Sequence, residues 1–369
     1  MKQKQLSPFE EKLNNFVRDH LTRIPLIQKI FFIEHLYTMI HAGLSLVESL
    51  DILSKEIENK KLKKIIGEIK IDIEKGQSLA EVLAKHPKAF PPIYVKMIEA
   101  GEIGGKLEES LKQVVNQMQK NEKLISTVRG AMIYPAVIVF AMTAIGIMMV
   151  TMILPKLMVL FKEFDAKLPL ATRVLIAITD FASKPLNMAI IIVSLITTIV
   201  LFVFSLKKYP KFKRFIHKIN LHLPVFGTVI KKINLARFSL TLSSLLKSTI
   251  PIVQAVEITS ETCSNVLYRN HLKNTSEKIK TGTPLSEILR EDTYLFPPMV
   301  TEMVMVGEKT GEVNQLLDEL AKFYSNEVDK TMKNFATIIE PVIILALGLA
   351  VAGMAVAVIM PMYTLVQNF

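Results

Sequence analysis

Residues 131–154 read AMIYPAVIVFAMTAIGIMMVTMIL, a run in which every side chain is uncharged. A helix needs about 20 such residues to cross roughly 30 Å of hydrocarbon. Two further runs meet this requirement, namely PLNMAIIIVSLITTIVLFVFSL at residues 185–206 and PVIILALGLAVAGMAVAVIMP at residues 341–361. The sequence therefore predicts three transmembrane helices, at residues 131–154, 185–206 and 337–360.

The remaining sequence is charged and predicts helical domains outside the membrane. Roughly 130 residues precede the first run and roughly 130 lie between the second and third, each enough for a small domain. Apolar residues in FFIEHLYTMIHAGLSLVESLDIL (residues 31–53) recur at spacings of three and four, which is typical of helix faces turned to a core. We therefore expect an all-α membrane protein with two repeated cytoplasmic helical-bundle domains, at residues 31–130 and 237–336.

The distribution of basic residues predicts the orientation in the membrane. Nine Lys or Arg residues and no acidic residue lie from Lys207 to Arg237. Basic segments beside a span stay on the cytoplasmic side. The loop at residues 155–184 carries five basic and three acidic residues, and the tail at residues 361–369 carries no charge. We expect this loop and the tail to be external, and the basic linker at residues 207–236 to be cytoplasmic.

The start of the chain is charged and polar. Residues 1–16, MKQKQLSPFEEKLNNF, contain no apolar core and no cleavage site. A secretory signal peptide needs both features. We therefore expect residues 1–30 to form a cytoplasmic N-terminal segment of a multi-pass protein of the cytoplasmic membrane.

The basic block accounts for nine of the eleven net positive charges. Basic residues beside a span bind anionic lipid, at roughly 1 kcal/mol per residue near the surface. An acidic protein partner is the alternative ligand, whereas nucleic acid binding is not indicated. The candidate contact residues are Lys207, Lys208, Lys211, Lys213 and Arg214.

A shift of 206 residues aligns the two halves of the chain without a gap. GQSL at residues 76–79 falls on GTPL at residues 282–285, and FPP at residues 90–92 falls on FPP at residues 296–298. The same shift places Gly101, Glu102, Gly105, Pro135 and Pro155 on Gly307, Glu308, Gly311, Pro341 and Pro361. The repeat units therefore run from about Phe31 to Pro155 and from about Arg237 to Pro361. The extra span between them gives both units one orientation, unlike the inverted repeats of many transporters.

Turn signals within the repeat mark structural positions. Ser45-x-x-Glu48 and Ser78-x-x-Glu81 have the pattern of capping boxes at helix starts. The Pro-Pro pairs force an extended turn and preset the next helix, since Pro is tolerated in a first turn. These predicted structural turns are at Pro91, Pro92, Pro297 and Pro298.

The paired Gly-Glu-x-x-Gly segments are the main candidate sites, and two interpretations stay open. In the structural one, Gly101, Gly105, Gly307 and Gly311 allow left-handed or closely approaching backbone, and each Glu caps the following helix. In the functional one, the turns present Glu102 and Glu308 to a protein partner.

Motifs for chemistry are missing from the sequence. No GxxxxGK[ST], GxGxxG or HExxH pattern is present, and the single cysteine, Cys263, is expected to be a small buried apolar residue. We predict no enzyme activity, no catalytic residue, no cofactor and no metal site. Apart from Glu340, which lies at the edge of the third and is expected at the membrane interface, the predicted spans carry no charged residue or His, whereas ion-coupled transporters usually need one. An oligomeric transporter or channel remains the alternative function.

The order of these motifs resembles a known family. FFIEHLYTMIHAGLSLVESL, GQSL, FPP, AGEIGG-L and YP, repeated as LSSLLKSTIPIVQAV, GTPL, FPP, VGEKTG-V and EP, is similar to the type II secretion F and type IV pilus assembly platform family (GspF/PilC). The likeness covers about Phe31 to Pro361. It implies an inner-membrane platform protein that works with a cytoplasmic secretion or assembly ATPase to feed pilin-like subunits into a filament.

The resemblance also leads us to expect other inner-membrane assembly proteins and further copies of the chain as partners. One departure separates the two repeats. Residues 248–251 read STIP where residues 42–45 read AGLS. The two domains therefore need not bind the same partner.

Overall fold

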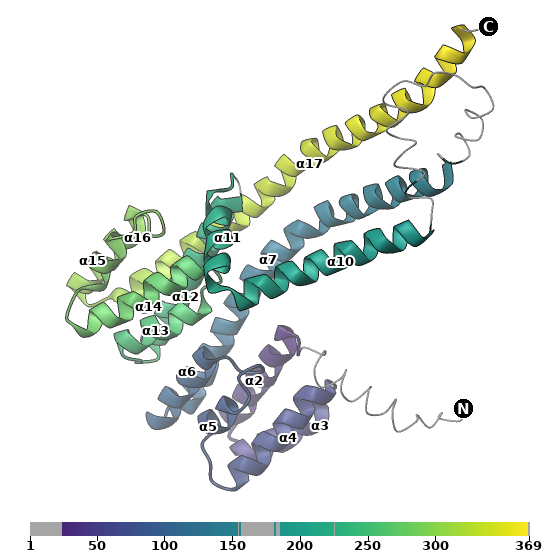
Figure 1. The fold of residues 1–369 in the computed structure, drawn as a ribbon. Helices are drawn as coiled ribbons and strands as arrows, with labels where there is room; N and C mark the ends of the chain where they lie inside the picture. The colour runs from purple at the N-terminus through teal and green to yellow at the C-terminus, as the bar shows by residue number, and fades with distance from the viewer. Residues whose placement is uncertain (1–23, 154, 156–180, 182–184, 225, 368–369) are drawn as a thin grey trace, which may run out of the picture. The chain divides into compact units, whose positions relative to one another are not determined.

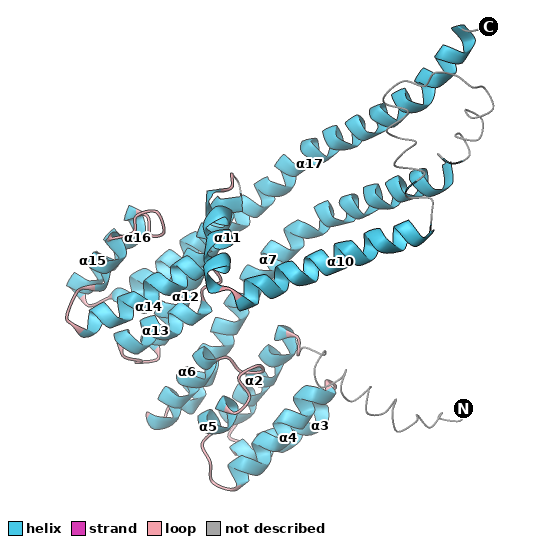
Figure 2. Ribbon diagram, viewed as in Figure 1, coloured by secondary structure: helices cyan, strands magenta, loops and turns pink. Residues whose placement is uncertain are grey.

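The computed structural model describes residues 24–153, 155, 181, 185–224 and 226–367. Within these residues every regular element is a helix, in agreement with the predicted all-α class (Figure 2). The chain forms two compact units. Unit 1 comprises Met1–Ser126 with Gly227–Val328, and unit 2 comprises Thr127–Phe226 with Asp329–Phe369. Both predicted helical domains thus contribute to unit 1.

The helices of the first repeat recur in the second with the predicted offset (Figure 1). The first set is α2 (Leu26–His41), α3 (Leu46–Glu56), α4 (Lys60–Glu74), α5 (Leu79–Ala84), α6 (Pro92–Ile103) and α7 (Leu107–Met148). The second set is α12 (Phe226–Lys247), α13 (Ile252–Thr262), α14 (Val266–Lys280), α15 (Leu285–Arg290), α16 (Pro298–Thr310) and α17 (Val313–Gln367). Helices α13 to α17 each begin 206 residues after α3 to α7, for example residue 252 against residue 46.

The helix starts follow the predicted turn signals. The side chains of Ser45 and Ser78 cap α3 and α5, and both capping boxes are complete. At the equivalent positions the second repeat has Pro251 and Pro284, which offer no side-chain cap. The Pro-Pro turns precede α6 and α16 as predicted, with Pro91 and Pro297 as the N-cap residues. Pro92 and Pro298 are the first residues of these helices.

The same aromatic pair lies in the core of each repeat. Phe32 contacts Phe90 with ring centroids 5.7 Å apart, and Phe238 contacts Phe296 at 5.3 Å. All four rings are fully buried. In the second repeat Tyr268 packs on Phe296 as well, and its hydroxyl donates to the carbonyl of Leu295 (2.8 Å). These rings hold the first helix of each repeat against the FPP turn, because each pair joins those two elements.

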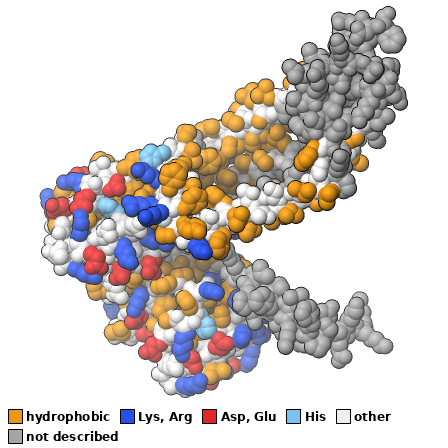
Figure 3. Space-filling model, viewed as in Figure 1, with side chains coloured by type: hydrophobic (Ala, Val, Ile, Leu, Met, Phe, Trp, Pro, Cys, Tyr) orange, Lys and Arg blue, Asp and Glu red, His pale blue; other side chains and the backbone are white. Residues whose placement is uncertain are grey.

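Two helices change character along their length. Helix α7 buries Leu111 and Met118, and α17 buries Leu317 and Leu320 in the same way. Beyond residue 131 of α7 and residue 337 of α17, apolar side chains are largely exposed, and orange side chains cover much of the described surface of unit 2 in Figure 3. Both helices are long and apolar enough to cross a membrane, judged by length and composition. The structure therefore agrees with two of the three predicted spans.

The third predicted span coincides with helix α10. This helix runs over Pro185–Lys208, where the prediction placed a span at residues 185–206. Many of the apolar side chains described on it are exposed, among them Ile190, Ile196 and Phe204. Helix α10 packs against α11 (Pro210–His222). That α10 crosses the membrane stays a prediction.

The segments around the spans differ from their predicted descriptions. The basic linker predicted at residues 207–236 contains α11 and the start of α12, because its apolar residues recur at helical spacing. Helix α7 continues into a short π-helix at Met149–Ile153, and α17 continues through Gln367 into the predicted tail. The predicted external loop lies outside the described residues except for residues 155 and 181. Residues 1–23 of the predicted N-terminal segment also lie outside them.

Cys263 lies in the core of the second repeat, as expected for a small apolar residue. Its side chain is fully buried, and burial raises the pKa of its thiol to about 12. The thiolate is the reactive form of cysteine. The Cys263 thiol is therefore inert in the folded protein at neutral pH.

One helix end carries backbone strain. Helix α2 ends in a Schellman motif, in which Leu44 N–H donates to the carbonyl of Met39. Gly43 takes the left-handed position of this motif (φ 90°). Helix α12 ends in the same way, with Ile250 N–H donating to the carbonyl of Leu245, but Thr249 takes the left-handed position (φ 58°). Among the described residues, Thr249 is the only residue other than glycine with a positive φ. A β-branched residue in this conformation is strained.

We predict that Thr249→Gly raises the free energy of unfolding by about 1 kcal/mol, because glycine removes the left-handed strain. The reciprocal change, Gly43→Thr, is expected to lower it by about 1–3 kcal/mol. Urea unfolding of the purified chain in detergent, followed by circular dichroism, measures both.

Gly67→Ala is the control for these glycine changes. Gly67 lies inside α4 and an added Cβ meets nothing within 4 Å. Alanine there is expected to raise the stability by about 0.5–1 kcal/mol, since it favours the helix. A lower stability for Thr249→Gly would contradict the strain assigned to Thr249.

Candidate functional site

The Glu102 carboxylate is bound to the start of α5. Glu102 lies in the last turn of α6, and its Oε1 accepts a hydrogen bond from Leu79 N–H at 2.6 Å. Its Oε2 accepts from Ala80 N–H at 2.8 Å. The first N–H groups of a helix have no partner within the helix, and the helix dipole favours a negative charge there. The carboxylate thus satisfies two orphan donors of α5 from another helix.

The Glu308 carboxylate makes the equivalent contact in the second repeat. Its Oε1 accepts from Leu285 N–H at 2.6 Å, and its Oε2 accepts from Ser286 N–H at 3.1 Å. The hydroxyl of Ser286 also donates to Oε2. Both glutamates therefore cap the short helix that precedes them, whereas the structural interpretation from the sequence placed the cap on the following helix. A contact between these carboxylates and a protein partner stays a prediction.

The first glycine of each turn is needed for close packing. A Cβ added at Gly101 would lie 2.2 Å from Cβ of Ser110, and one added at Gly307 would lie 2.8 Å from Cα of Val313. Real Cβ atoms do not approach other atoms so closely. Glycine at these positions lets α6 and α16 meet the starts of α7 and α17.

The last glycine of each turn is needed for the backbone conformation. Gly105 has φ 65° and Gly311 has φ 77°, both in the left-handed region that favours glycine. Lys106 N–H donates to the carbonyl of Gly101 at 2.7 Å, which closes the first turn. The geometry therefore accounts for all four glycines, as the structural interpretation expected.

The two turns present different side chains to their surroundings. The residue after Glu102 is Ile103, whose side chain is 83% exposed. The residue after Glu308 is Lys309, which is also exposed. An exposed isoleucine suits an apolar contact, whereas an exposed lysine suits an acidic one. The turns share one internal structure but differ in the surface that they offer.

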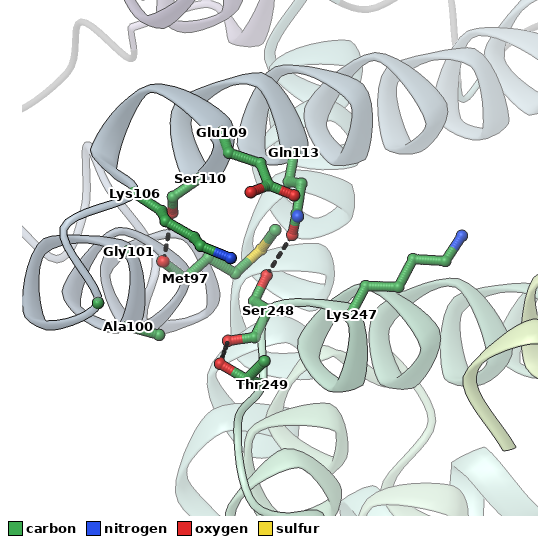
Figure 4. A pocket seen from close by; sticks show the side chains of 11 residues that line it. Met97, Ala100, Gly101, Lys106, Glu109, Ser110, Gln113, Lys247, Ser248 and Thr249 are labelled. Atoms are coloured by element: carbon green, nitrogen blue, oxygen red, sulfur yellow. Dashed lines mark hydrogen bonds between the residues drawn. The ribbon is translucent and has the colours of Figure 1, made fainter. Parts of the chain in front are cut away.

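A pocket in unit 1 lies between the first Gly-Glu turn and residues 248–249, which belong to the segment whose sequence differs between the repeats. It has a volume of about 220 Å³ and is lined by Met97, Ala100, Gly101, Gly104, Lys106, Glu109, Ser110, Gln113, Lys247, Ser248 and Thr249 (Figure 4). Ser248 donates to Oε1 of Gln113 at 2.6 Å, which links α12 to α7. The Thr249 hydroxyl donates to the carbonyl of Ser248 at 2.7 Å. The strained residue of the second repeat thus lies beside the Gly-Glu turn of the first.

A cluster of charges around Asp318 also joins the repeats within unit 1. Asp318 of α17 lies 3.0 Å from Lys120 of α7 and 3.6 Å from Lys247 of α12. A third lysine, Lys322, lies at 3.4 Å. Burial raises the pKa of Asp318, but the hydrogen bond from Lys120 and the nearby lysine charges outweigh it, so the pKa lies below its usual value. The sequence contains no signal for this cluster, because its residues come from three distant segments.

The basic residues chosen from the sequence lie on α10 and α11. Lys207 and Lys208 end α10, and Lys211, Lys213 and Arg214 follow on α11. All are exposed except Lys213, which is half-buried. Among the residues that the structure describes, none of the five forms an ion pair with an acidic side chain.

The later residues of the basic block have partners within unit 1. The ammonium of Lys231 lies 3.2 Å from the ring centre of Tyr294, and Lys232 pairs with Glu327 at 2.8 Å. Arg237 is half-buried, and its Nη1 donates to the carbonyl of Thr262 at 3.5 Å. The block therefore divides into a structural part in the second repeat and an exposed part on α10 and α11.

The polar groups of the two turns are used in packing. Within the described part of the chain, no group of three or more His, Cys, Asp or Glu side chains is placed to hold a metal ion. The carboxylates of Glu102 and Glu308 and the hydroxyl of Ser248 all have protein partners. The arrangement is suited to holding helices together and to presenting surface side chains.

Comparison with known proteins assigns the repeat. The family model described as "Type II secretion system (T2SS), protein F" matches the chain twice, at residues 32–155 and 238–361. These two matches agree with the repeat units predicted from the sequence.

Relatives with two kinds of name match most of the chain. Over 336 aligned residues it is 33% identical to the type IV pilus assembly protein PilC of Myxococcus xanthus. This alignment covers 91% of this chain and 80% of that protein. Over 357 aligned residues it is 34% identical to PilC of Thermus thermophilus, and this alignment covers 93% of this chain and 86% of that protein. Over 332 aligned residues it is 28% identical to the type II secretion system protein F of Pseudomonas aeruginosa, and this alignment covers 90% of this chain and 81% of that protein.

We predict that Glu102→Ala and Glu308→Ala each lower the free energy of unfolding by about 1–2 kcal/mol, because each leaves two helix N–H groups without their cap. The loss is expected to be larger for Glu308, which also binds the Ser286 hydroxyl. Urea unfolding in detergent measures both effects, and the double variant should show their sum, since the sites are in different repeats.

Glu109→Ala is the matched control, because Glu109 is an exposed acidic residue on the neighbouring helix α7. Its substitution is expected to change stability by less than about 0.5 kcal/mol. Equal stability of Glu102→Ala and Glu109→Ala would contradict the cap.

Proposed function

The chain belongs to the Type II secretion system protein F family, and we propose that it is the inner-membrane platform protein of a type IV pilus or type II secretion assembly machine. The two matches to this family over the repeat carry the proposal, and relatives named for pilus assembly and for type II secretion support it. In this role the chain couples a cytoplasmic assembly ATPase to the insertion of pilin-like subunits into a filament.

The proposed topology has three transmembrane helices. Helices α7 and α17 provide two of them, and the exposed apolar surface of α10 supports the third. The two spans between the repeats put both repeats on one side of the membrane, and the third span puts the C-terminus on the other. The basic residues that follow α10 favour the cytoplasmic side.

The proposed mechanism is transmission of movement along helices. The sequence contains no nucleotide-binding motif, so the energy must come from a partner. The first turns of α7 and α17 contribute Leu111 and Leu317 to the cores of the two repeats, and the same helices continue as exposed apolar segments. In each case one continuous helix connects the repeat to the segment proposed to span the membrane, so a displacement that the ATPase applies to a repeat is carried along that helix.

The proposed partner surfaces are the paired turns and the exposed basic residues. Since the glutamates are held inside each domain, Ile103 and Lys309 are the side chains that the turns offer to a partner. Their different chemistry supports different partners for the two repeats. Other inner-membrane assembly proteins and further copies of this chain are the proposed neighbours in the membrane.

We predict that reporter fusions detect three spans. Alkaline phosphatase fused within residues 155–184 should be active, because that loop is external. Green fluorescent protein fused after residue 224 should fluoresce, because that segment is cytoplasmic. Alkaline phosphatase is also fused after residue 224, where it should be inactive. Activity there would show that α10 does not cross the membrane and would refute the three-span topology.

We predict that deletion of the gene abolishes surface filaments or protein secretion, as seen by electron microscopy of the cells and by assay of the medium. The intact chain should restore the lost activity, and Ile103→Ser should fail to do so at normal membrane levels. Ile71→Ser is the matched control, because Ile71 is an exposed isoleucine (52%) on α4, outside the turn. It should restore activity fully.

Normal filaments and secretion after deletion, with no second copy of the gene in the genome, would refute the platform function. That result would favour the oligomeric transporter or channel. Full restoration by Ile103→Ser would refute only the contact proposed for the first turn.

A further inference from the structure

Helix α11 begins at a bend directly after α10. The single residue between them, Tyr209, is extended (φ −109°, ψ 99°), and Pro210 is the first residue of α11. A residue before proline is disfavoured in the helical conformation, and proline lacks the N–H that would continue α10. The chain turns at this point, as Figure 1 shows. The bend lets α11 take a direction that differs from that of a spanning helix.

Helix α11 has a packed side and an exposed side. On the packed side, Leu221 is buried. Phe212 precedes it by nine residues and therefore lies on the opposite side, where its half-buried ring meets the Phe202 ring of α10 edge-on, with centroids 6.1 Å apart. On the exposed side, Phe215 is 59% exposed and Ile219 is 40% exposed. These two residues are four apart and therefore neighbours on the helix surface. They line one surface hollow of about 430 Å³ together with Lys218, His222 and Leu223.

The exposed side of α11 is also basic. Lys211 precedes Phe215 by four residues and Lys218 follows it by three, so both are neighbours of the ring on the helix surface. Arg214 lies between these two lysines on the helix surface and is exposed. No acidic residue occurs from Lys207 to Phe226. In the described part of the chain, no acidic side chain pairs with Lys211, Arg214 or Lys218.

An exposed apolar stripe with basic residues along one edge matches one environment best. A helix that lies in the membrane interface buries its apolar side chains at the boundary of the acyl chains, while Lys and Arg bind anionic headgroups. Tyr209, which is 54% exposed, lies at the junction with α10, and tyrosine is enriched at this level of the bilayer. The exposed apolar helix α10 immediately before the bend brings α11 to that level.

We propose that α11 lies in the cytoplasmic interface of the membrane, with Phe215 and Ile219 at the acyl boundary and Lys211, Arg214 and Lys218 at anionic lipid headgroups. This rests on the proposed function in one respect, because α10 must cross the membrane. The contact sets the depth of the cytoplasmic end of α10. It also sets the level at which the chain enters the second repeat at α12.

The test uses the full chain in nanodiscs that contain phosphatidylcholine alone or a mixture with phosphatidylglycerol. A single cysteine is introduced by Phe215→Cys and labelled with a fluorophore sensitive to polarity. Native Cys263 is buried and stays unlabelled. Ile196→Cys on α10 is the control inside the membrane, and Ile71→Cys on α4 is the control in water. Quenching is measured with doxyl groups at a shallow position on the lipid and with aqueous iodide.

We expect shallow doxyl lipid to quench the label at position 215, and more strongly in the anionic nanodiscs. The triple variant Lys211→Glu, Arg214→Glu and Lys218→Glu should lose this dependence on anionic lipid, since its charges are reversed. The label at position 196 should not respond to the triple change. The label at position 71 should be quenched by iodide alone.

Each other result overturns the proposal in a distinct way. Iodide quenching at position 215, with lipid contact kept at position 196, would show that α11 faces water while α10 still spans. Protection from both quenchers would show that protein covers this side of α11. Iodide quenching at position 196 would refute the span of α10, and with it both the three-span topology and the place of α11.

Discussion

The two glutamate caps set the geometry on which the rest of each repeat depends. Helices α5 and α15 have six residues each, too short to be stable alone, and their first N–H groups are held by Glu102 and Glu308 from the helix that follows. This contact fixes the end of α6 and α16 against the short helix. Because Gly101 and Gly307 then allow close approach, the next helix, α7 or α17, starts from a defined place. The proposed transmission of movement along α7 and α17 begins from this start.

The two repeats share their internal packing contacts and differ in residues at helix ends and turns. The aromatic pairs Phe32–Phe90 and Phe238–Phe296 are equivalent, as are the glutamate caps. The differences lie at Thr249, which replaces a left-handed glycine, and at Ile103 and Lys309 on the turns. Residues that make the shared contacts have internal partners, so a change there costs stability. Thr249, Ile103 and Lys309 are the positions on which the proposal of separate partners for the two repeats rests.

Charge is divided between packing and the membrane surface. The cluster around Asp318 and the pair Lys232–Glu327 join segments that are far apart in sequence, and their charges are compensated within unit 1. The basic residues of α10 and α11 lie beside exposed apolar side chains and belong to a stretch without acidic residues. Compensated charges fix the packing of the repeats, whereas the uncompensated ones are available to anionic lipid.

The sequence by itself determined the helical class, the apolar helices, the repeat offset and the starts of α3, α5 and α6, because hydropathy, helical spacing and capping residues are local signals. It also placed the glycines at turns correctly. Only the tertiary structure decided which helix each glutamate caps, since Leu79 and Leu285 lie 23 residues from their acceptors. The Asp318 cluster and the exposed side of α11 were decided in the same way. Partners across a fold, and the side of a helix that stays uncovered, are set by packing, which no local pattern encodes.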